Sequence, residues 1–551
     1  MKIALPFQGR PPLRALGLAG LAAGILASTA VVHSQARTRI TPYLEIQQVL
    51  NADLNGGDVL TYTSVGGGVD ANIQTRRVTA TISYNYQRRI AWEGDLADDD
   101  VHSGLAAVQV QVVPGMLTFD AGALATRSHG DIAVPVAGVR TADSSNLVDI
   151  YSAYAGPTLS TKAGPLDIGA SYRLGYVYVD DHSVAGAGAP GGQRFDEYNS
   201  STVHSAAASV GMGPGELPFG WTVGAGYSRA DSDHLDATNE AKFIRADVVV
   251  PVSHSLALTA GVGYEKITAS QDDYRRDANG LPILTPGGGL IADPSRPRLL
   301  AYDQDGLIWD AGVLWRPSRR TELQARVGRR YGGTTYTGSL EHRINQSYAL
   351  TASVYDSVTS FGQLLLLDLN GVPSKFNNRR NFGGGNFGGG LGSGDCVFGS
   401  GDEGGTCFDD ALQSVNGATF RNRGATVSLS GGRGPWSFSG GAGYANRLYY
   451  EPDGATFIYN GVTDESFTLQ AGISRALSRS SGINASAYAG IYDGGRADVG
   501  SSYNSGITGS YYRSIFHDRL QANIAAGLYH TSADDLDSTV ASVLFGLRYS
   551  F

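Results

Sequence analysis

The chain has 551 residues, of which 75 are glycine, and only 17% of its residues are charged. Glycine at about twice its usual share, with charged residues well below the usual quarter, is not the composition of an ordinary soluble enzyme. A net charge of −9 lacks the basic excess that neutralises phosphates, so nucleic acid is excluded as the main partner. Hydrophobic residues at 42% exclude a disordered chain.

The first 36 residues are organised like an export signal. They contain, in order, Lys2, Arg10, Arg14, the uncharged apolar stretch 15–32 and the small-x-small motif Ser34-Gln35-Ala36. This arrangement predicts a cleaved signal peptide, residues 1–36, followed by one exported domain, residues 37–551. An uncleaved membrane anchor is the alternative, since a stretch of about 18 apolar residues can just span a bilayer.

The beginning of the exported part carries three segments with a family resemblance. They are 41–45 (TPYLE), 57–65 (GDVLTYTSV) and 75–84 (TRRVTATISY). Together they resemble the start of uncharacterised barrels of sphingomonad-type bacteria that are associated with exopolysaccharide and exosortase-type export systems. The resemblance covers about 55 residues and implies components of polysaccharide export as partners.

From Ile40 onward, apolar and small or polar residues alternate with a period of two. In the segment 166–178, one face carries the apolar residues Leu166, Ile168, Ala170, Tyr172, Leu174, Tyr176 and Tyr178. The other face carries Asp167, Gly169, Ser171, Arg173 and Gly175. Strands of about 10 residues with one apolar face are typical of transmembrane β-barrels. A soluble sandwich also alternates, so the connections must separate the two architectures.

Short connections alternate with long, more acidic ones along the whole chain. Turns such as 114–116 and 162–165 alternate with loops such as 127–146, 180–200 and 271–298. Short turns at one rim and long loops at the other are typical of an outer-membrane barrel with up-and-down strands. We therefore expect an all-β antiparallel barrel of about 22 strands, with a range of 18 to 24. Because the strand pattern begins at Ile40, we expect no plug domain before the barrel.

The predicted inner face of the middle strands carries both signs of charge. The candidate lumen charges are Asp310, Glu322, Arg326, Arg330, Glu341 and Arg343. Opposite charges on neighbouring strands would form a charged ladder of the kind that sets pore selectivity. The alternative is that the same ion pairs only brace the wall.

The segment Val358 to Gly417 is the longest predicted extracellular loop. Loops of this length are usually functional or disordered, and its run Leu364 to Leu367 is too apolar to remain in water. We expect this run to pack against the barrel wall or inside its mouth as a lid or constriction. Cys396 and Cys407 lie 11 positions apart in the same segment, which predicts a disulfide in an oxidising compartment.

The end of the chain contains Gly546, Tyr549 and a terminal Phe551. This spacing resembles the C-terminal signal of bacterial outer-membrane proteins, and the resemblance implies that barrel-assembly machinery binds the last strand. Leu544 stands where that signal usually has a polar residue.

Motifs for catalysis are missing from the sequence. It has no G-x-S-x-G, no H-E-x-x-H, no phosphate-binding Gly-Lys-Ser/Thr loop and no metal-spaced Cys/His cluster. We therefore expect no enzymatic activity, no cofactor and no metal centre. His204-Ser205 and Asp233-His234 are the only fragments that a hydrolase hypothesis can use. Acidic clusters such as 98–100 and 272–273 are either solvated loop charge or divalent-cation sites beside lipopolysaccharide phosphates.

A barrel of about 22 strands has a lumen wider than side chains can fill. The sequence therefore favours a porin-like channel of the Gram-negative outer membrane, for solutes or exported polysaccharide, in contact with outer-membrane lipid and lipopolysaccharide. A structural or assembly barrel, filled by its own loops, is the alternative, and an outer-membrane hydrolase is the third hypothesis.

Overall fold

The computed structural model describes most of the chain after residue 36. The described residues are 37–93, 99–129, 147–181, 198–285, 290–345, 347–376, 396–398, 405–408, 411–412, 415–453, 460–495, 500–516, 519–533 and 536–551. The predicted signal peptide, residues 1–36, lies outside this part, so its cleavage and the expected absence of a preceding plug domain stay predictions.

The described residues form 24 strands, one α-helix and one short 3-10 helix. The first half contains β1 (Arg37–Asp53), β2 (Val59–Gln74), β3 (Val78–Glu93), β4 (Asp99–Val113), β5 (Leu117–His129), β6 (Leu147–Ala163), β7 (Leu166–Asp181), β8 (Ser200–Met212), β9 (Gly220–Ser232), η1 (His234–Asp236), β10 (Ala237–Pro251), β11 (Leu256–Gln271) and β12 (Leu299–Ser318). The second half contains β13 (Thr321–Arg330), β14 (Gly333–Asn345), β15 (Tyr348–Ser360), α2 (Phe361–Asn370), β16 (Cys396–Phe398), β17 (Gly405–Cys407), β18 (Thr419–Arg433), β19 (Trp436–Tyr450), β20 (Thr463–Ala476), β21 (Ser481–Asp493), β22 (Ser501–Ile515), β23 (Leu520–Ala533) and β24 (Leu536–Ser550).

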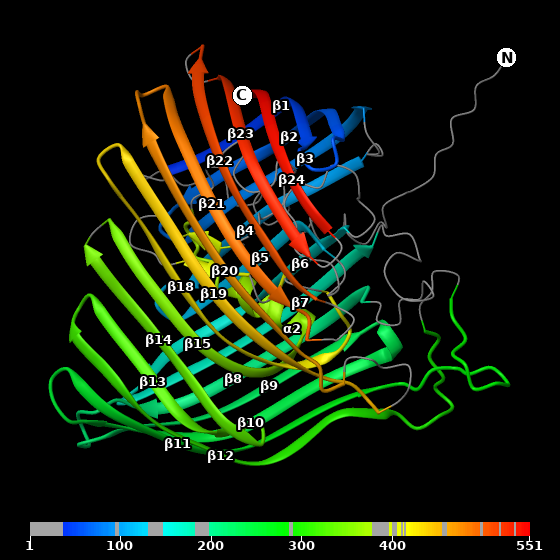
Figure 1. The fold of residues 1–551 in the computed structure, drawn as a ribbon. Helices are drawn as coiled ribbons and strands as arrows, with labels where there is room; N and C mark the ends of the chain where they lie inside the picture. Colours follow the sequence, from blue (N-terminus) through cyan, green and yellow to red (C-terminus); the bar gives the residue numbers. More distant parts are fainter. Residues whose placement is uncertain are drawn as a thin grey trace.

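Twenty-two of the strands form one closed antiparallel barrel (Figure 1). Each strand pairs with the next along the chain, β15 pairs with β18, and β24 returns to pair with β1. The predicted up-and-down topology and strand number are therefore confirmed. The remaining strands, β16 and β17, form a separate two-stranded sheet. None of the described helices is long and apolar enough to span a membrane.

The two faces of the barrel wall differ as the alternation predicts. On β1, Leu44 and Ile46 are exposed on the outer face, whereas Tyr43, Glu45 and Gln47 are buried on the inner face. Large apolar side chains are exposed in the same alternating way on most other strands of the barrel. A band of exposed leucine, isoleucine, valine and aromatic residues on the outer wall is stable only against lipid, so the fold is that of a membrane-spanning barrel.

The orientation of the two faces predicts unequal effects of a new charge. Ile524 is exposed on the outer face of β23, four residues above the turn end of that strand, which places it near the middle of the apolar band. Ile524→Arg is expected to cost about 2 to 4 kcal/mol of barrel stability, because lipid does not solvate the guanidinium. Ser510→Arg, on the inner face of β22, is expected to have a small effect. Urea unfolding of both variants in lipid vesicles measures the difference, and equal losses would contradict the assignment of the faces.

Candidate functional site in the barrel lumen

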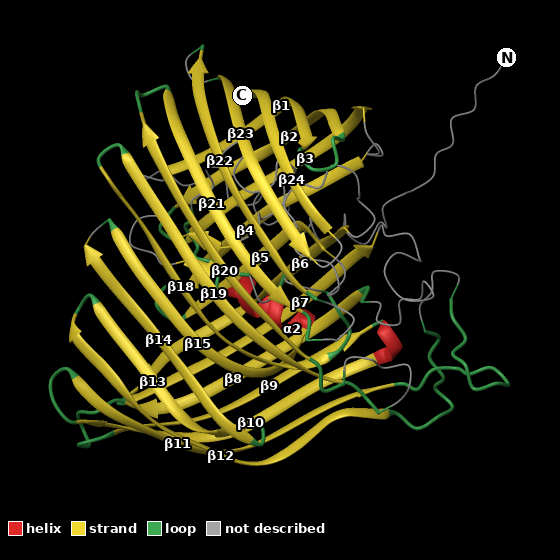
Figure 2. Ribbon diagram, viewed as in Figure 1, coloured by secondary structure: helices red, strands yellow, loops and turns green. Residues whose placement is uncertain are grey.

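A helix follows β15 directly and lies inside the barrel (Figure 2). Ser360 is the N-cap of α2, and its backbone N–H donates to Oε1 of Gln363 at 3.2 Å, as in a capping box. The prediction that residues 358–417 form an extracellular loop needs correction here. Residues 358–360 belong to β15, and α2 turns inward because its leucines find an apolar wall there.

The helix packs tightly against the inner wall formed by β5 to β8. Its buried residues include Phe361, Leu364, Leu365 and Leu366. Gly175 on β7 permits the close approach, since a Cβ at that position would lie 2.2 Å from Cδ1 of Leu366. The structure therefore packs the predicted leucine run inside the barrel, except Leu367, whose side chain is 63% exposed.

Three hydrogen bonds fix the helix and the following segment to separate strands of the wall. Nε2 of Gln363 donates to Oγ of Ser228 on β9 at 3.0 Å, and Nε of Arg173 on β7 donates to Oδ1 of Asn370 at 3.3 Å. Beyond the helix, Oγ1 of Thr81 on β3 donates to the carbonyl oxygen of Ser374 at 2.9 Å.

One apolar core joins distant walls of the barrel through this segment. On the β4 to β9 side it includes Val148, Ile150, Val177, Val179 and Val203. On the other side it reaches Phe420 on β18, Tyr449 on β19 and Tyr492 on β21. The bridging residues are Phe361, Leu364, Leu365, Leu366, Leu369, Val372, Phe376, Val397, Phe408, Ala411, Leu412, Val415 and Ala418. Described residues of the segment between β15 and β18 therefore cross the lumen.

The sequence contained a signal for this wall that the search for alternation missed. Val177 and Val179 alternate with Tyr176 and Tyr178, so the upper part of β7 is apolar on both faces. Val148 and Ile150 are likewise buried apolar residues on the inner face of β6. Two neighbouring strands with apolar inner faces indicate that something apolar covers them inside the barrel.

A network of charges lines the inner wall at β10, β12 and β13. Nη2 of Arg245 on β10 lies 2.9 Å from Oδ2 of Asp310 on β12. Nη1 of Arg326 on β13 lies 2.8 Å from Oδ1 of Asp247 and 3.1 Å from Oδ1 of Asp310. These four side chains are only 15 to 21% exposed and alternate in sign. We call them the wall tetrad.

The other predicted lumen charges do not join one ladder. Arg330 forms an ion pair with Glu265, with Nε and Oε2 2.7 Å apart, and Glu322 pairs with Arg316 at 2.6 Å. On β14, Glu341 lies directly opposite Glu322, and Arg343 lies two residues beyond Glu341. Of the predicted residues, Asp310 and Arg326 form an ion pair with each other, and Glu322 and Glu341 are register partners.

The partners that sequence analysis missed are Arg245, Asp247, Glu265 and Arg316. Arg245 and Asp247 are two positions apart on one strand, so a shared face was visible in the sequence. Their contacts with β12 and β13 depend on strand register, which the sequence did not fix.

The two cysteines face each other across the small sheet. Cys396 on β16 is the register partner of Cys407 on β17. Their side chains lie outside the described residues, so the disulfide stays a prediction that this backbone pairing favours.

The three residues of the predicted assembly signal lie on the closing strand or next to it. Gly546 on β24 faces Gln47 of β1, and Tyr549 is exposed on the outer face. The N–H of Phe551 donates to the carbonyl oxygen of Pro42 at 3.0 Å, and the rings of Tyr549 and Phe551 meet edge to face at 5.2 Å.

Comparison with known proteins adds no family. No protein-family model matches the chain, and no curated protein matches it. Among solved structures, the ferric-catecholate import receptor Fiu from E. coli K12 is similar, at 10% identity over 92% of this chain and 82% of that one, with a TM-score of 0.45. The FrpB iron transporter from Neisseria meningitidis is similar at 11% identity over 92% and 81%, with a TM-score of 0.43. The siderophore receptor PiuA from Acinetobacter baumannii is similar at 9% identity over 92% and 82%, also with a TM-score of 0.43.

The fragments considered for a hydrolase are placed apart. His204 and Ser205 are consecutive on β8, so their side chains point to opposite faces, and Nδ1 of His204 lies 2.8 Å from the hydroxyl of Tyr172. Asp233 accepts a hydrogen bond from Ser200. Among the described residues, no group of three or more His, Cys, Asp or Glu side chains is placed to hold a metal ion. The hydrolase hypothesis receives no geometric support from this part of the chain.

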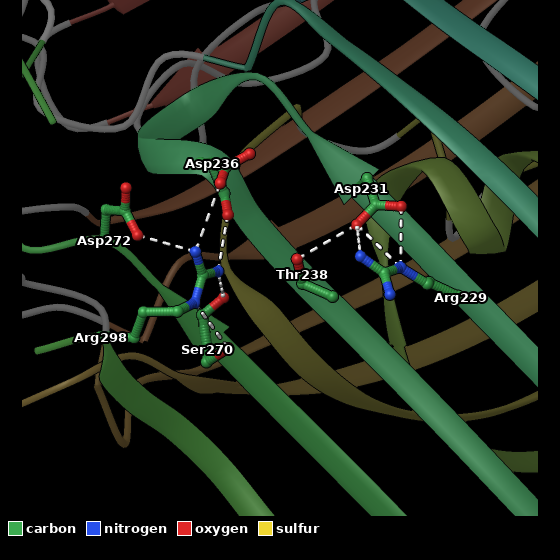
Figure 3. Close-up of polar contacts among 7 residues, drawn as sticks. All are labelled: Arg229, Asp231, Asp236, Thr238, Ser270, Asp272 and Arg298. Atoms are coloured by element: carbon green, nitrogen blue, oxygen red, sulfur yellow. Dashed lines mark hydrogen bonds and ion pairs between the residues drawn. The ribbon is translucent and has the colours of Figure 1, made fainter. Parts of the chain in front are cut away.

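Arginines tie the loops together at the long-loop rim (Figure 3). Arg298 donates from Nη1 to Asp272 at 2.7 Å and from Nη2 to the carbonyl oxygen of Asp236 at 2.7 Å, which joins the β9–β10 turn to the loop after β11. Burial alone would raise the pKa of Asp273, but hydrogen bonds from Arg296 and Arg276 hold that pKa below its ordinary value. In the structure, these aspartates of the acidic loops therefore bind arginines of the same loops.

The rim also contains a buried histidine, which predicts a pH response. Burial lowers the pKa of His234 to about 4, below about 6.5 for an exposed histidine. A chain with this rim unfolded therefore binds the proton more readily, so the contribution of His234 to rim stability is complete above pH of about 6.5 and is lost as the pH falls towards 4. Amide hydrogen exchange in the η1 turn is expected to accelerate over that range. His234→Leu should remove the pH dependence, whereas replacing the exposed His254 should preserve it; an unchanged profile in His234→Leu would contradict the assignment.

Proposed function

We propose that the protein is a channel of the Gram-negative outer membrane for hydrophilic solutes, narrowed by the segment between β15 and β18. The observation that carries this proposal is the position of α2, which covers the β5 to β8 wall while the wall tetrad stays partly exposed to water. A wide barrel with an internal helix on one side and charged, water-accessible residues on the other retains a polar passage.

The wall tetrad supports a passage with weak ion selectivity. Two arginines and two aspartates alternate, so the four side chains have no net charge, and each guanidinium contacts a carboxylate. Such a wall repels neither cations nor anions strongly, and it offers hydrogen-bonding groups to neutral polar solutes such as sugars. The tetrad braces the wall at the same time.

Single-channel recording of the purified protein in a planar bilayer tests the proposal. We expect discrete open steps with similar permeability to potassium and chloride. A strong preference for either ion would contradict the role given to the tetrad. Complete absence of steps would contradict the channel itself.

The second candidate function is a non-conducting barrel with a structural or assembly role. It is favoured by the apolar core that joins the β4 to β9 wall with Phe420, Tyr449 and Tyr492 through the lumenal segment. If that core seals the lumen, the same recordings will be silent for the wild type. Bilayer recordings therefore separate the two functions directly.

Exported polysaccharide is the specific substrate that the N-terminal resemblance suggests. The resembling segments lie mainly on β1, β2 and β3, the first three strands of the barrel. Deleting the gene should then lower surface polysaccharide while periplasmic polysaccharide accumulates. Unchanged surface polysaccharide would leave small polar solutes as the substrate class.

We further propose that barrel-assembly machinery binds β24. This strand pairs with β1, so closure of the barrel depends on it, and its outer face ends in Tyr549 and Phe551. Deleting Phe551 should lower the amount of folded barrel in outer-membrane fractions without lowering export across the inner membrane. Heat-modifiable migration on gels measures the folded fraction, and a normal amount would contradict the proposal.

A further inference from the structure

Two lysines face each other on the outer wall of the barrel. Lys242 on β10 and Lys266 on β11 are direct partners in the antiparallel register. Their neighbours on the same face, Ile244 and Tyr264, are 57% and 50% exposed. By contrast, Glu265, which lies between Tyr264 and Lys266 on β11, is buried on the inner face. Both ammonium groups therefore project from the face that carries the apolar band.

The lysine pair lies at the upper border of that band. Lys242 is nine residues above Pro251, where β10 ends at the short-turn rim. Nine residues span roughly 30 Å along a strand. At the usual tilt of a barrel strand this is a height of roughly 23 Å, close to the full height of about 25 Å of an apolar band. One step below the pair, the outer face is apolar, with Ile244 and Leu307 exposed.

The charges of the pair are incompletely balanced within the described part of the protein. Like charges directly opposite in a sheet repel each other. Nζ of Lys242 lies 3.6 Å from Oε2 of Glu240, and Lys266 makes no ion pair with any described residue. Asp305 on β12 is the register partner of Lys266. Any anion that binds Lys266 must therefore compete with this carboxylate for the ammonium group.

One row above the lysines, the outer face carries Arg229, Glu240 and Asp303, and Asp231 lies one row higher on β9. Nη2 of Arg229 donates to Oδ1 of Asp231 at 2.8 Å, and Thr238 donates to the same carboxylate at 3.1 Å (Figure 3). Arg229 and Asp231 therefore neither supply a free cation nor oppose an anion at the lysine pair. Lys242 and Lys266 are the cations that can hold an anion at this level, and the anion must compete with the carboxylates of Glu240, Asp303 and Asp305.

We propose that Lys242 and Lys266 bind a phosphate group of a phosphorylated glycolipid in the outer leaflet. A phosphate between two ammonium groups relieves their repulsion, and the acyl chains of the same lipid can lie on the apolar residues Ile244, Tyr264 and Leu307. The height of the pair and the adjacent apolar surface favour a lipid over a soluble anion. This inference rests on the proposed outer-membrane location.

Native mass spectrometry of the full barrel in detergent tests the site. The probes are lipid A with two phosphates, the same lipid A without phosphates, and inorganic phosphate. We expect the phosphorylated lipid to bind the wild type at least about tenfold more tightly than the dephosphorylated lipid. The Lys242→Gln, Lys266→Gln double variant should lose this preference, and the matching double arginine variant should keep it.

Lys162→Gln is the matched control, because Lys162 is 77% exposed near the short-turn end of β6, where it pairs with Asp167 on β7. This variant should bind like the wild type, and heat-modifiable migration must show that every variant is folded. Equal binding by the wild type and the double glutamine variant would overturn the proposal, as would equal binding of both lipids. Tight binding of inorganic phosphate alone would overturn the choice of a lipid as the occupant. Cell fractionation tests location separately, so a failure of the outer-membrane proposal is distinguishable from a failure of the site.

Discussion

Replacing Leu365 by aspartate is expected to open the lumen and to raise single-channel conductance several-fold. Leu365 is fully buried in the apolar core that joins α2 to the inner wall, so a carboxylate there would lie among apolar side chains. Burying an unpaired charge costs far more than the few kcal/mol that an apolar contact of this size contributes, so α2 should leave the wall. The barrel itself should persist, because all of its strand pairs lie outside the helix.

Leu367→Asp is the matched control on the same helix. Its side chain is 63% exposed, so the new charge stays in water and conductance should match the wild type. Susceptibility of cells to large antibiotics gives a second measurement, and it should rise only for Leu365→Asp. Equal conductance of the two variants, with both barrels folded, would show that α2 does not obstruct the passage.

Replacing Asp464 by asparagine is expected to destabilise the barrel by about 3 to 5 kcal/mol, the usual cost of removing one partner of a buried ion pair. Nε of Arg447 lies 3.0 Å from Oδ1 of Asp464, and both side chains are 2% exposed. The hydroxyls of Tyr449 and Tyr492 donate to Oδ2 of the same carboxylate at 2.9 and 3.1 Å. The substitution removes the carboxylate charge of Asp464 beside the buried guanidinium of Arg447.

An exposed pair provides the comparison for that loss. Lys162 and Asp167 lie 3.0 Å apart with exposures of 77% and 54%, so Asp167→Asn should cost at most about 1 kcal/mol. Urea unfolding of both variants in lipid vesicles measures the difference. A similar small loss for both would mean that water or another group solvates Arg447 in the unmodified barrel.

Strand number and face assignment could be predicted from the sequence because both follow from local alternation. Leu44 and Ile46 on one face and Tyr43 and Glu45 on the other are separated by that pattern alone. The interior was predicted less well, because it depends on contacts between segments far apart in the chain. Apolar residues on both faces of β7 pointed to a covering element, but only the structure identifies α2 as that element.

Strand register explains the same difference for the charges. Asp310 and Arg326 were recognisable as inner-face residues, yet their contacts with Arg245 and Asp247 join three strands whose relative register no local pattern specifies. The Lys242 and Lys266 pair has the same origin, since two unremarkable lysines become neighbours only through the pairing of β10 with β11.

The pairing of β1 with β24 has a consequence for the order in which the protein can fold. Because β1 and β24 are the first and last strands of the described barrel, the cylinder cannot close until β24 has paired with β1. The β4 to β9 wall emerges earlier, and its apolar inner surface would then face water on an open, curved sheet. The helix that covers this surface follows β15, well before the closing strand. While the cylinder is still open, α2 can therefore cover the apolar inner surface of the sheet and support its curvature.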